Sequence, residues 1–269
     1  NLGWAGTGPL GMLAAAPILA VWEPGLFATS ATLGLVTFIL LLPIAARPTH
    51  LETDHPDRPQ PHVLSRYKSL LASARWSMLS AFALTLVVAS LMPMLFKDGL
   101  GLGESTAIQL GSIKDFARLA MFALLFLTPR WHGRIDVLIL TALLLPTAFF
   151  TVLFAPTPTV AGIALATMGA AEGMAYCAAL YYAIVVTNAS VDAGGAHESR
   201  GGLAFTIGPA AGLLGQYCTT LLEGDRILGN ILGIGPVALI CLAAALRSLW
   251  RAPAQPLPTP AGATDRAQP

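Results

Sequence analysis

Residues 135–154 read IDVLILTALLLPTAFFTVLF, and this stretch decides the fold class. Its one charged side chain, Asp136, stands at the second position. About 20 apolar residues make a helix long enough to cross the hydrocarbon core of a bilayer. Lipid offers the backbone no hydrogen-bond partner, so a spanning segment must satisfy its own backbone groups. The stretch therefore predicts a transmembrane helix.

Similar apolar stretches recur along the whole chain. Of its 269 residues, 55% are hydrophobic and 11% are charged, and the mean hydropathy is +0.69. This composition leaves too little polar surface to cover a soluble globule. Long Leu, Ala, Ile and Val runs favour helices over the short alternating strands of a barrel. We expect an all-α, polytopic membrane protein with spans at 3–22, 26–46, 75–96, 107–127, 135–154, 159–186, 202–222 and 228–250.

The distribution of basic residues predicts the orientation. Of the 15 lysines and arginines, eleven lie in the connections on one side or near the C-terminal end. The connections on the other side hold two, Lys97 and Arg226. Because cytoplasmic loops carry the excess of Lys and Arg, we expect both ends of the chain to be cytoplasmic.

The connection at residues 47–74 is long and polar and contains HLETDHPDRPQPH. We expect a cytoplasmic linker between two bundles, residues 1–46 and 75–251, with 63–74 lying as an amphipathic helix on the membrane. Its histidines and carboxylates show no ligand-like repeat, so we expect no metal site there. Residues 252–269 have almost nothing to bury, and we expect them to be a disordered cytoplasmic tail.

Two spans, a long linker and six further spans resemble a twelve-helix major facilitator superfamily transporter that lacks its first four helices. On this resemblance, residues 1–46 are the last two helices of the N-terminal half, and 75–251 form the complete C-terminal half. The chain begins with Asn1 and an apolar segment. We therefore expect a piece of a longer protein, with the missing N-terminal helices as its partners.

Local segments carry the same resemblance. LFLTPRWHGR, at 125–134, resembles the family's basic cytoplasmic loop between helices eight and nine, although it lacks the aspartate and leading glycine of that loop. GMAYCAALYYAIV, at 173–185, and GGLAFTIGPAAGLLG, at 201–215, resemble the tenth and eleventh helices of bacterial members. The resemblance implies a transporter of a bacterial inner (plasma) membrane, with Arg130 and Arg134 in a cytoplasmic gate.

Four ionisable residues fall inside predicted spans: Lys114, Asp115 and Arg118 in SIKDFARLAMF, and Glu172 in GAAEGMAY. Charges at the bilayer centre cost about 2.5 to 3.5 kcal/mol on insertion scales, so they usually face a cavity or one another. Asp115 and Arg118 share a helix face, and Lys114 and Arg118 share an adjoining one. One interpretation is a neutral interhelical network, such as Arg118 with Glu172, that fixes packing. The other is a solute and proton pathway, in which the cations hold an anionic group and a carboxylate exchanges a proton.

Three further sets of residues have two interpretations each. Tyr176 lies four residues after Glu172. On one interpretation it orients that carboxylate or contacts solute, and on the other it is a core tyrosine bonded to the backbone. His197, Glu198 and Arg200 form either a solvated helix start or a cytoplasmic gate with a titrating histidine. Gly208, Pro209, Gly212 and Gly215 recur at helical spacing, which predicts close helix packing and a bend that can also serve as a gate.

The sequence argues against several function classes. It has no nucleophile with a base at matching depth and no acidic cluster on a cytoplasmic loop, so we expect neither enzyme activity nor a cofactor. A net charge of +1 without a basic, aromatic-rich stretch gives no sign of nucleic-acid binding. We predict a secondary active transporter of a small solute that works by alternating access. Glu172 and Asp115 are the candidates for proton coupling, and the cationic residues point to an anionic or zwitterionic solute. The alternative is a non-transporting membrane subunit or sensor with a structural polar core.

Overall fold

The computed structural model describes residues 61–187, 207, 208, 210–222 and 224–253, together with isolated helical positions between 28 and 39. Every regular element in these ranges is a helix. The elements are α3 (Pro61–Met92), the π-helix η1 (Pro93–Gly99), α4 (Glu104–Leu127), the 3-10 turn η2 (Pro129–Trp131), α5 (Ile135–Leu153), α6 (Pro158–Thr187) and α8 (Arg226–Trp250). Residues 207, 208 and 210–221 are helical as well.

Four of these helices contain segments that are long and apolar enough to cross a membrane. The segments are Ser65–Met92, Ile135–Leu153, Pro158–Val186 and Ile227–Trp250. The last three match the expected spans to within a few residues. The prediction of a polytopic helical membrane protein is confirmed at this level. The spans expected at 3–22 and 26–46 and the tail after Pro253 lie outside the ranges that the structure describes, apart from the isolated positions.

α4 is also long enough to span, because its 24 residues rise by about 36 Å. It is not among the four candidate spans, since three charged residues, Lys114, Asp115 and Arg118, lie together near its middle. The expected span at 107–127 nevertheless coincides with this helix. Its charged residues lie on the side that packs against α6, while Phe116, Leu124 and Phe126 are exposed.

α3 begins at Pro61, whereas the sequence suggested a span from Arg75 preceded by a separate surface helix at 63–74. The structure shows one continuous helix of 32 residues through both segments. Leu70, Leu71 and Ala74, which were expected to lie on the membrane surface, are buried in the core. The expected surface helix is therefore wrong, because its apolar residues are buried against other helices of the bundle.

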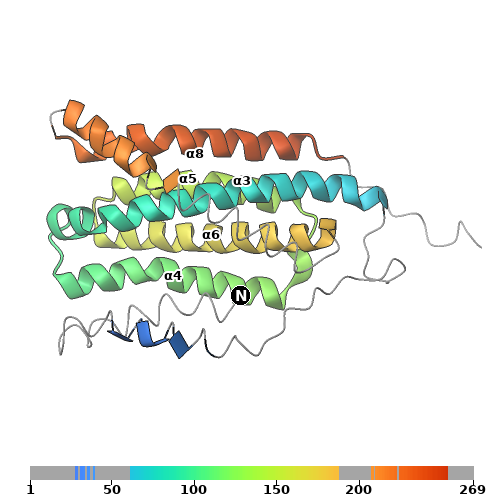
Figure 1. The fold of residues 1–269 in the computed structure, drawn as a ribbon, viewed down its shortest axis with the longest axis horizontal. Coiled ribbons are helices and arrows are strands. Elements are labelled where there is room, and N and C mark those ends of the chain that lie inside the picture. Colours follow the sequence, from blue (N-terminus) through green and yellow to red (C-terminus); the bar gives the residue numbers. More distant parts are fainter. Residues whose placement is uncertain are drawn as a thin grey trace, which may run out of the picture.

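The long helices run roughly parallel to one another, with α6 between α4 on one side and α3 and α5 on the other (Figure 1). α8 packs on α3 and α5, away from α4. The buried apolar side chains form two clusters along the bundle. The first includes Leu95, Phe149 and Leu165, and the second includes Leu70, Leu138 and Tyr182.

Candidate functional site

α4 and α6 come very close where α6 carries two glycines four residues apart. A Cβ atom placed on Gly169 would overlap the main chain of Lys114, and one on Gly173 would lie 3.1 Å from the carbonyl oxygen of Arg118. Glycines at this spacing let the backbones of two membrane helices approach. Gly169 and Gly173 therefore hold α6 against the charged stretch of α4, and Glu172 lies between them in the sequence.

Lys114, Asp115, Arg118 and Glu172 meet at this contact, and each cation touches each carboxylate. Arg118 Nη1 lies 2.8 Å from Glu172 Oε1, and its Nη2 lies 3.0 Å from Asp115 Oδ1. Lys114 Nζ lies 2.9 Å from Asp115 Oδ1 and 3.5 Å from Glu172 Oε2. We call these four side chains the charge network. Two cations and two carboxylates make its formal charge zero.

A third helix reaches the charge network through a hydroxyl group. Thr85 of α3 donates a hydrogen bond of 3.1 Å from its Oγ1 to Glu172 Oε2. Glu172 thus contacts groups from two other helices, Arg118 and Lys114 on α4 and Thr85 on α3. The carboxylate is the point at which α3, α4 and α6 are joined by polar contacts.

The charge network is buried in the middle of the bundle. The exposed fraction is 1% for the Glu172 side chain, 5% for Lys114, 6% for Asp115 and 11% for Arg118. On α6, the first apolar cluster ends at Ala171 and the second begins at Met174. The network therefore separates the two apolar halves of the core, at the fifteenth of the 30 residues of α6.

Tyr176 is directed into the apolar core beside the charge network. Its ring centroid lies 5.6 Å from that of Phe122 and 6.3 Å from that of Phe82, and the residue is 7% exposed. These contacts place its ring between α3 and α4. The geometry favours the interpretation of Tyr176 as a core aromatic residue.

Arg130 and Arg134 lie on the loop between α4 and α5, which packs on the ends of α3 and α6. The Gly133 N–H donates to the Tyr182 hydroxyl at 2.9 Å, and Arg66 Nη2 donates to the Gly133 carbonyl at 3.0 Å. Gly133 has φ of +71°, a left-handed conformation that glycine adopts without strain. The loop therefore has a fixed place on the bundle.

Two charged or titrating side chains of this loop have defined surroundings. Arg134 Nε bonds Asp136 Oδ1 at 3.0 Å, and this exposed carboxylate raises the pKa of Arg134. His132 stacks on Tyr181 with ring centroids 3.9 Å apart, and its partial burial lowers the pKa of His132. His197, Glu198 and Arg200, the other expected gate residues, lie outside the described residues.

The three glycines that the sequence places at helical spacing, Gly208, Gly212 and Gly215, have different surroundings. A Cβ atom on Gly215 would lie 2.9 Å from Asn230 of α8, and one on Gly208 would lie 2.8 Å from Leu86 of α3. A Cβ atom on Gly212 would meet nothing within 4 Å. Two of the three glycines thus lie at close helix contacts. Pro209 lies outside the described residues.

Sequence reasoning missed three residues that build the site. Gly169 and Gly173 form a G-x-x-x-G pattern inside an apolar span, a readable signal for close helix packing. Thr85 gave no such signal, because a single threonine in an apolar helix usually bonds its own backbone. Only the packing of α3 on α6 brings its hydroxyl to Glu172.

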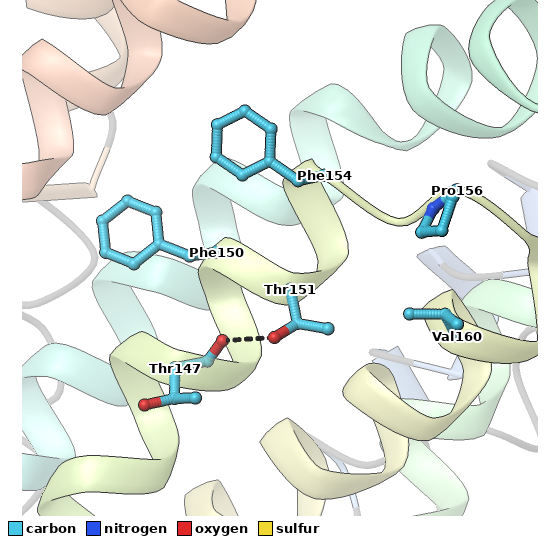
Figure 2. Close-up of a pocket in the computed structure, with 6 residues that line it drawn as sticks. All are labelled: Thr147, Phe150, Thr151, Phe154, Pro156 and Val160. Atoms are coloured by element: carbon cyan, nitrogen blue, oxygen red, sulfur yellow. Dashed lines mark hydrogen bonds between the residues drawn. The ribbon is translucent and has the colours of Figure 1, made fainter.

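An apolar pocket of about 560 Å³ lies elsewhere, between the end of α5 and the start of α6 (Figure 2). Its lining consists of Thr147, Phe150, Thr151, Phe154, Pro156 and Val160. Both threonine hydroxyls donate to helix carbonyls four residues earlier. Val160 precedes Glu172 by 12 positions on α6, or about 18 Å, so this pocket is separate from the charge network.

Within the described residues, no three His, Cys, Asp or Glu side chains come together as a metal site would require. Cys177, Cys218 and Cys241 are free thiols. Cys177 lies on α6 and Cys241 on α8, so both belong to helices with candidate spans.

Comparisons with known proteins leave the family open. No protein family matches the sequence, and no similar chain was found among curated proteins or solved structures.

Proposed function

We propose that this protein is a secondary transporter that moves a small solute across a membrane by alternating access. The observation that carries the proposal is the charge network, which lies buried halfway along a helical membrane bundle. In this proposal Lys114, Asp115, Arg118 and Glu172 form the solute and proton pathway. Thr85 holds the Glu172 carboxylate in place.

The energy of such a network supports a functional role. Each charge at mid-membrane depth carries an insertion cost of about 2.5 to 3.5 kcal/mol. Replacing a buried ion pair with apolar side chains is often neutral or stabilising by about 1 to 4 kcal/mol. Packing alone therefore gives little reason to keep four charges at one level of the core, and an ionisable group within a membrane span is by default a candidate functional site.

The geometry suggests how the charges work. Because Arg118 and Lys114 each contact both carboxylates, protonation of Glu172 or Asp115 weakens one contact of each cation. An anionic solute group can then replace the neutral carboxyl as the partner of the cations. Loss of the proton from the carboxyl restores the original pairs and releases the anion. This exchange couples proton movement to the binding of an anion.

The arrangement of the chain fits a transporter of the major facilitator type. The helices α3, α4, α5, α6 and α8, with the helical residues 207, 208 and 210–221, support the proposal of a six-helix C-terminal half. Alternating access needs two bundles that rock about a shared midplane site. The proposal therefore includes a second bundle, formed by residues 1–46 with further helices. It also includes a bacterial inner membrane, with the loop 128–134 and the C-terminus of α8 on the cytoplasmic side.

A second candidate function is a non-transporting membrane subunit or sensor. The observation in its favour is that the network is neutral, paired and at most 11% exposed. In that case the charges only fix the packing of α4 on α6.

A pair of substitutions separates the two functions. Arg118→Met together with Glu172→Gln removes one charge of each sign and leaves Lys114 paired with Asp115. The native protein and the double variant are reconstituted in proteoliposomes, and uptake of radiolabelled phosphate and small organic acids is measured with and without a pH gradient. Thermal stability in detergent is measured on the same samples.

We expect the double variant to keep its stability and to lose uptake of every acid that the native protein accumulates. Retained uptake in a stable double variant would assign the network to packing. Absence of uptake by the native protein, with and without the pH gradient, would favour the non-transporting subunit. The single variant Arg118→Lys keeps the charge and serves as the matched control. It should retain measurable uptake, because Lys can still approach Glu172, although it loses the two-pronged contact of Arg118.

A further inference from the structure

The two ends of the described bundle differ in charge. At the end formed by the start of α3, the loop 128–134 and the C-terminus of α8, the cations are Arg66, Lys68, Arg130, Arg134, Arg247 and Arg251. Among the described side chains at this end, Asp136 is the one carboxylate. The opposite end shows Lys97 with Asp98 and Asp225. We call the first end the basic end.

Arg66 brings three elements of the basic end together. Its Nη1 donates to the Pro253 carbonyl and its Nη2 to the Gly133 carbonyl, both at 3.0 Å. Carbonyl oxygens are neutral acceptors, so the positive charge of Arg66 is not cancelled by these bonds. The contacts also place the segment after α8, with Arg251, beside the start of α3.

The last turn of α8 adds two exposed arginines and an exposed tryptophan. Arg247 and Arg251 are four residues apart and share one side of the helix end. Trp250, between them, is 92% exposed. Tryptophan at the end of a membrane helix lies at the level of the lipid headgroups, where its ring meets both apolar chains and water.

We propose that the basic end binds the phosphate groups of anionic phospholipids, with Arg247 and Arg251 as the main contacts and Arg66 beside them. Basic groups between membrane helices attract anionic headgroups, and arginine binds phosphate through parallel hydrogen bonds. Arg134 contributes less, because Asp136 already holds it. This inference does not depend on whether the protein transports a solute.

The neighbouring apolar surface favours a lipid over a free phosphate ion. Leu239 and Ile240 on α8 are 63% and 62% exposed, and they precede Arg247 by about 11 Å along the helix. Leu140 on α5, which packs on α8, is 57% exposed. A phospholipid whose phosphate group contacts the arginines would therefore have its acyl chains beside an apolar surface.

Quenching of tryptophan fluorescence by brominated lipids tests the proposal. The protein is placed in phosphatidylcholine bilayers that contain brominated phosphatidylglycerol or, for comparison, brominated phosphatidylcholine. We expect stronger quenching by the anionic lipid, and most of the difference should disappear in Trp250→Phe. In Arg247→Gln with Arg251→Gln, the preference should fall by up to about fivefold for each arginine removed. Arg247→Lys with Arg251→Lys should retain most of the preference, since the charge remains.

Lys97→Gln at the opposite end is the matched control and should leave the preference unchanged. Equal quenching by the two lipids in the native protein would overturn the proposal, as would an equal loss in Lys97→Gln. Displacement of the anionic lipid by glycerol phosphate would reassign the arginines to a soluble anion. If the glutamine variant does not fold, the native protein decides alone: its preference must fall in about 1 M salt, where the screening length is about 3 Å.

Discussion

The charge network and the basic end use cationic side chains in opposite ways. In the network, the side chains of Lys114 and Arg118 are 5% and 11% exposed, and each contacts two carboxylates. At the basic end, Arg66 contacts backbone carbonyls and Arg247 and Arg251 are exposed. Buried charges need opposite charges, whereas charges near water are solvated and remain open to external partners. The network is therefore suited to exchange partners inside the protein, and the basic end to bind groups outside it.

The largest expected effect comes from removing one member of the charge network. Glu172→Gln leaves Arg118 and Lys114 with a single carboxylate, Asp115, and breaking a buried ion pair costs about 3 to 5 kcal/mol. The matched change at the basic end is Asp136→Asn, which removes the exposed partner of Arg134 and should leave stability unchanged. Thermal unfolding in detergent measures both. Equal effects of the two substitutions would remove the distinction between the regions.

The close approach of α4 and α6 gives the next effect. Gly169→Ala forces the helices apart at Lys114, and overpacking of this kind typically costs about 1 to 3 kcal/mol. Gly212→Ala is the matched control, because a Cβ atom there meets nothing within 4 Å. We expect this control to be as stable as the native protein or slightly more stable. A native-like melting midpoint in Gly169→Ala would show that the charge network does not need this contact.

The smallest effect concerns His132 at the basic end. Partial burial lowers the pKa of His132 from about 6.5, so the unfolded chain binds a proton at higher pH than the folded protein does. The contribution of this group to stability is complete above about pH 6.5 and decreases as the pH falls below that value. His132→Phe retains a ring beside Tyr181 and removes the titration. The melting midpoint should therefore fall less between about pH 7.5 and about pH 5.5 in this variant than in the native protein. Identical pH dependence in both proteins would contradict this assignment.

The sequence was sufficient for the helices whose apolar residues run without interruption. It also placed Asp115 beside Arg118, because their spacing of three residues fixes a shared helix face, and it suggested Arg118 with Glu172. It was not sufficient for the start of α3, where basic residues at Arg66 and Lys68 resemble a surface helix although Leu70 and Leu71 are buried. The contact of Thr85 with Glu172 depends on tertiary packing alone, so no local sequence pattern predicts it.

The direction of Tyr176 shows the same limit. Its spacing from Glu172 gives the shared helix face, whereas the aromatic rings of Phe82 and Phe122 that lie beside its own ring could not be predicted from that spacing. Those rings come from two other helices, and a one-helix pattern contains no information about them. The charge network was therefore predictable in its members and less so in its surroundings.

Accessibility of the charge network to water tests the central claim most directly. Cys177, Cys218 and Cys241 are replaced by alanine, and a single cysteine is introduced by Arg118→Cys or Glu172→Cys in the native protein in membranes. Labelling with a membrane-impermeant thiol reagent is then measured from each side, with the cysteine-free protein as the control. Alternating access predicts that both positions are labelled, since the network must meet water in part of the cycle. Protection of both positions from both sides, in variants that insert normally, would contradict the account and identify the network as a sealed structural core.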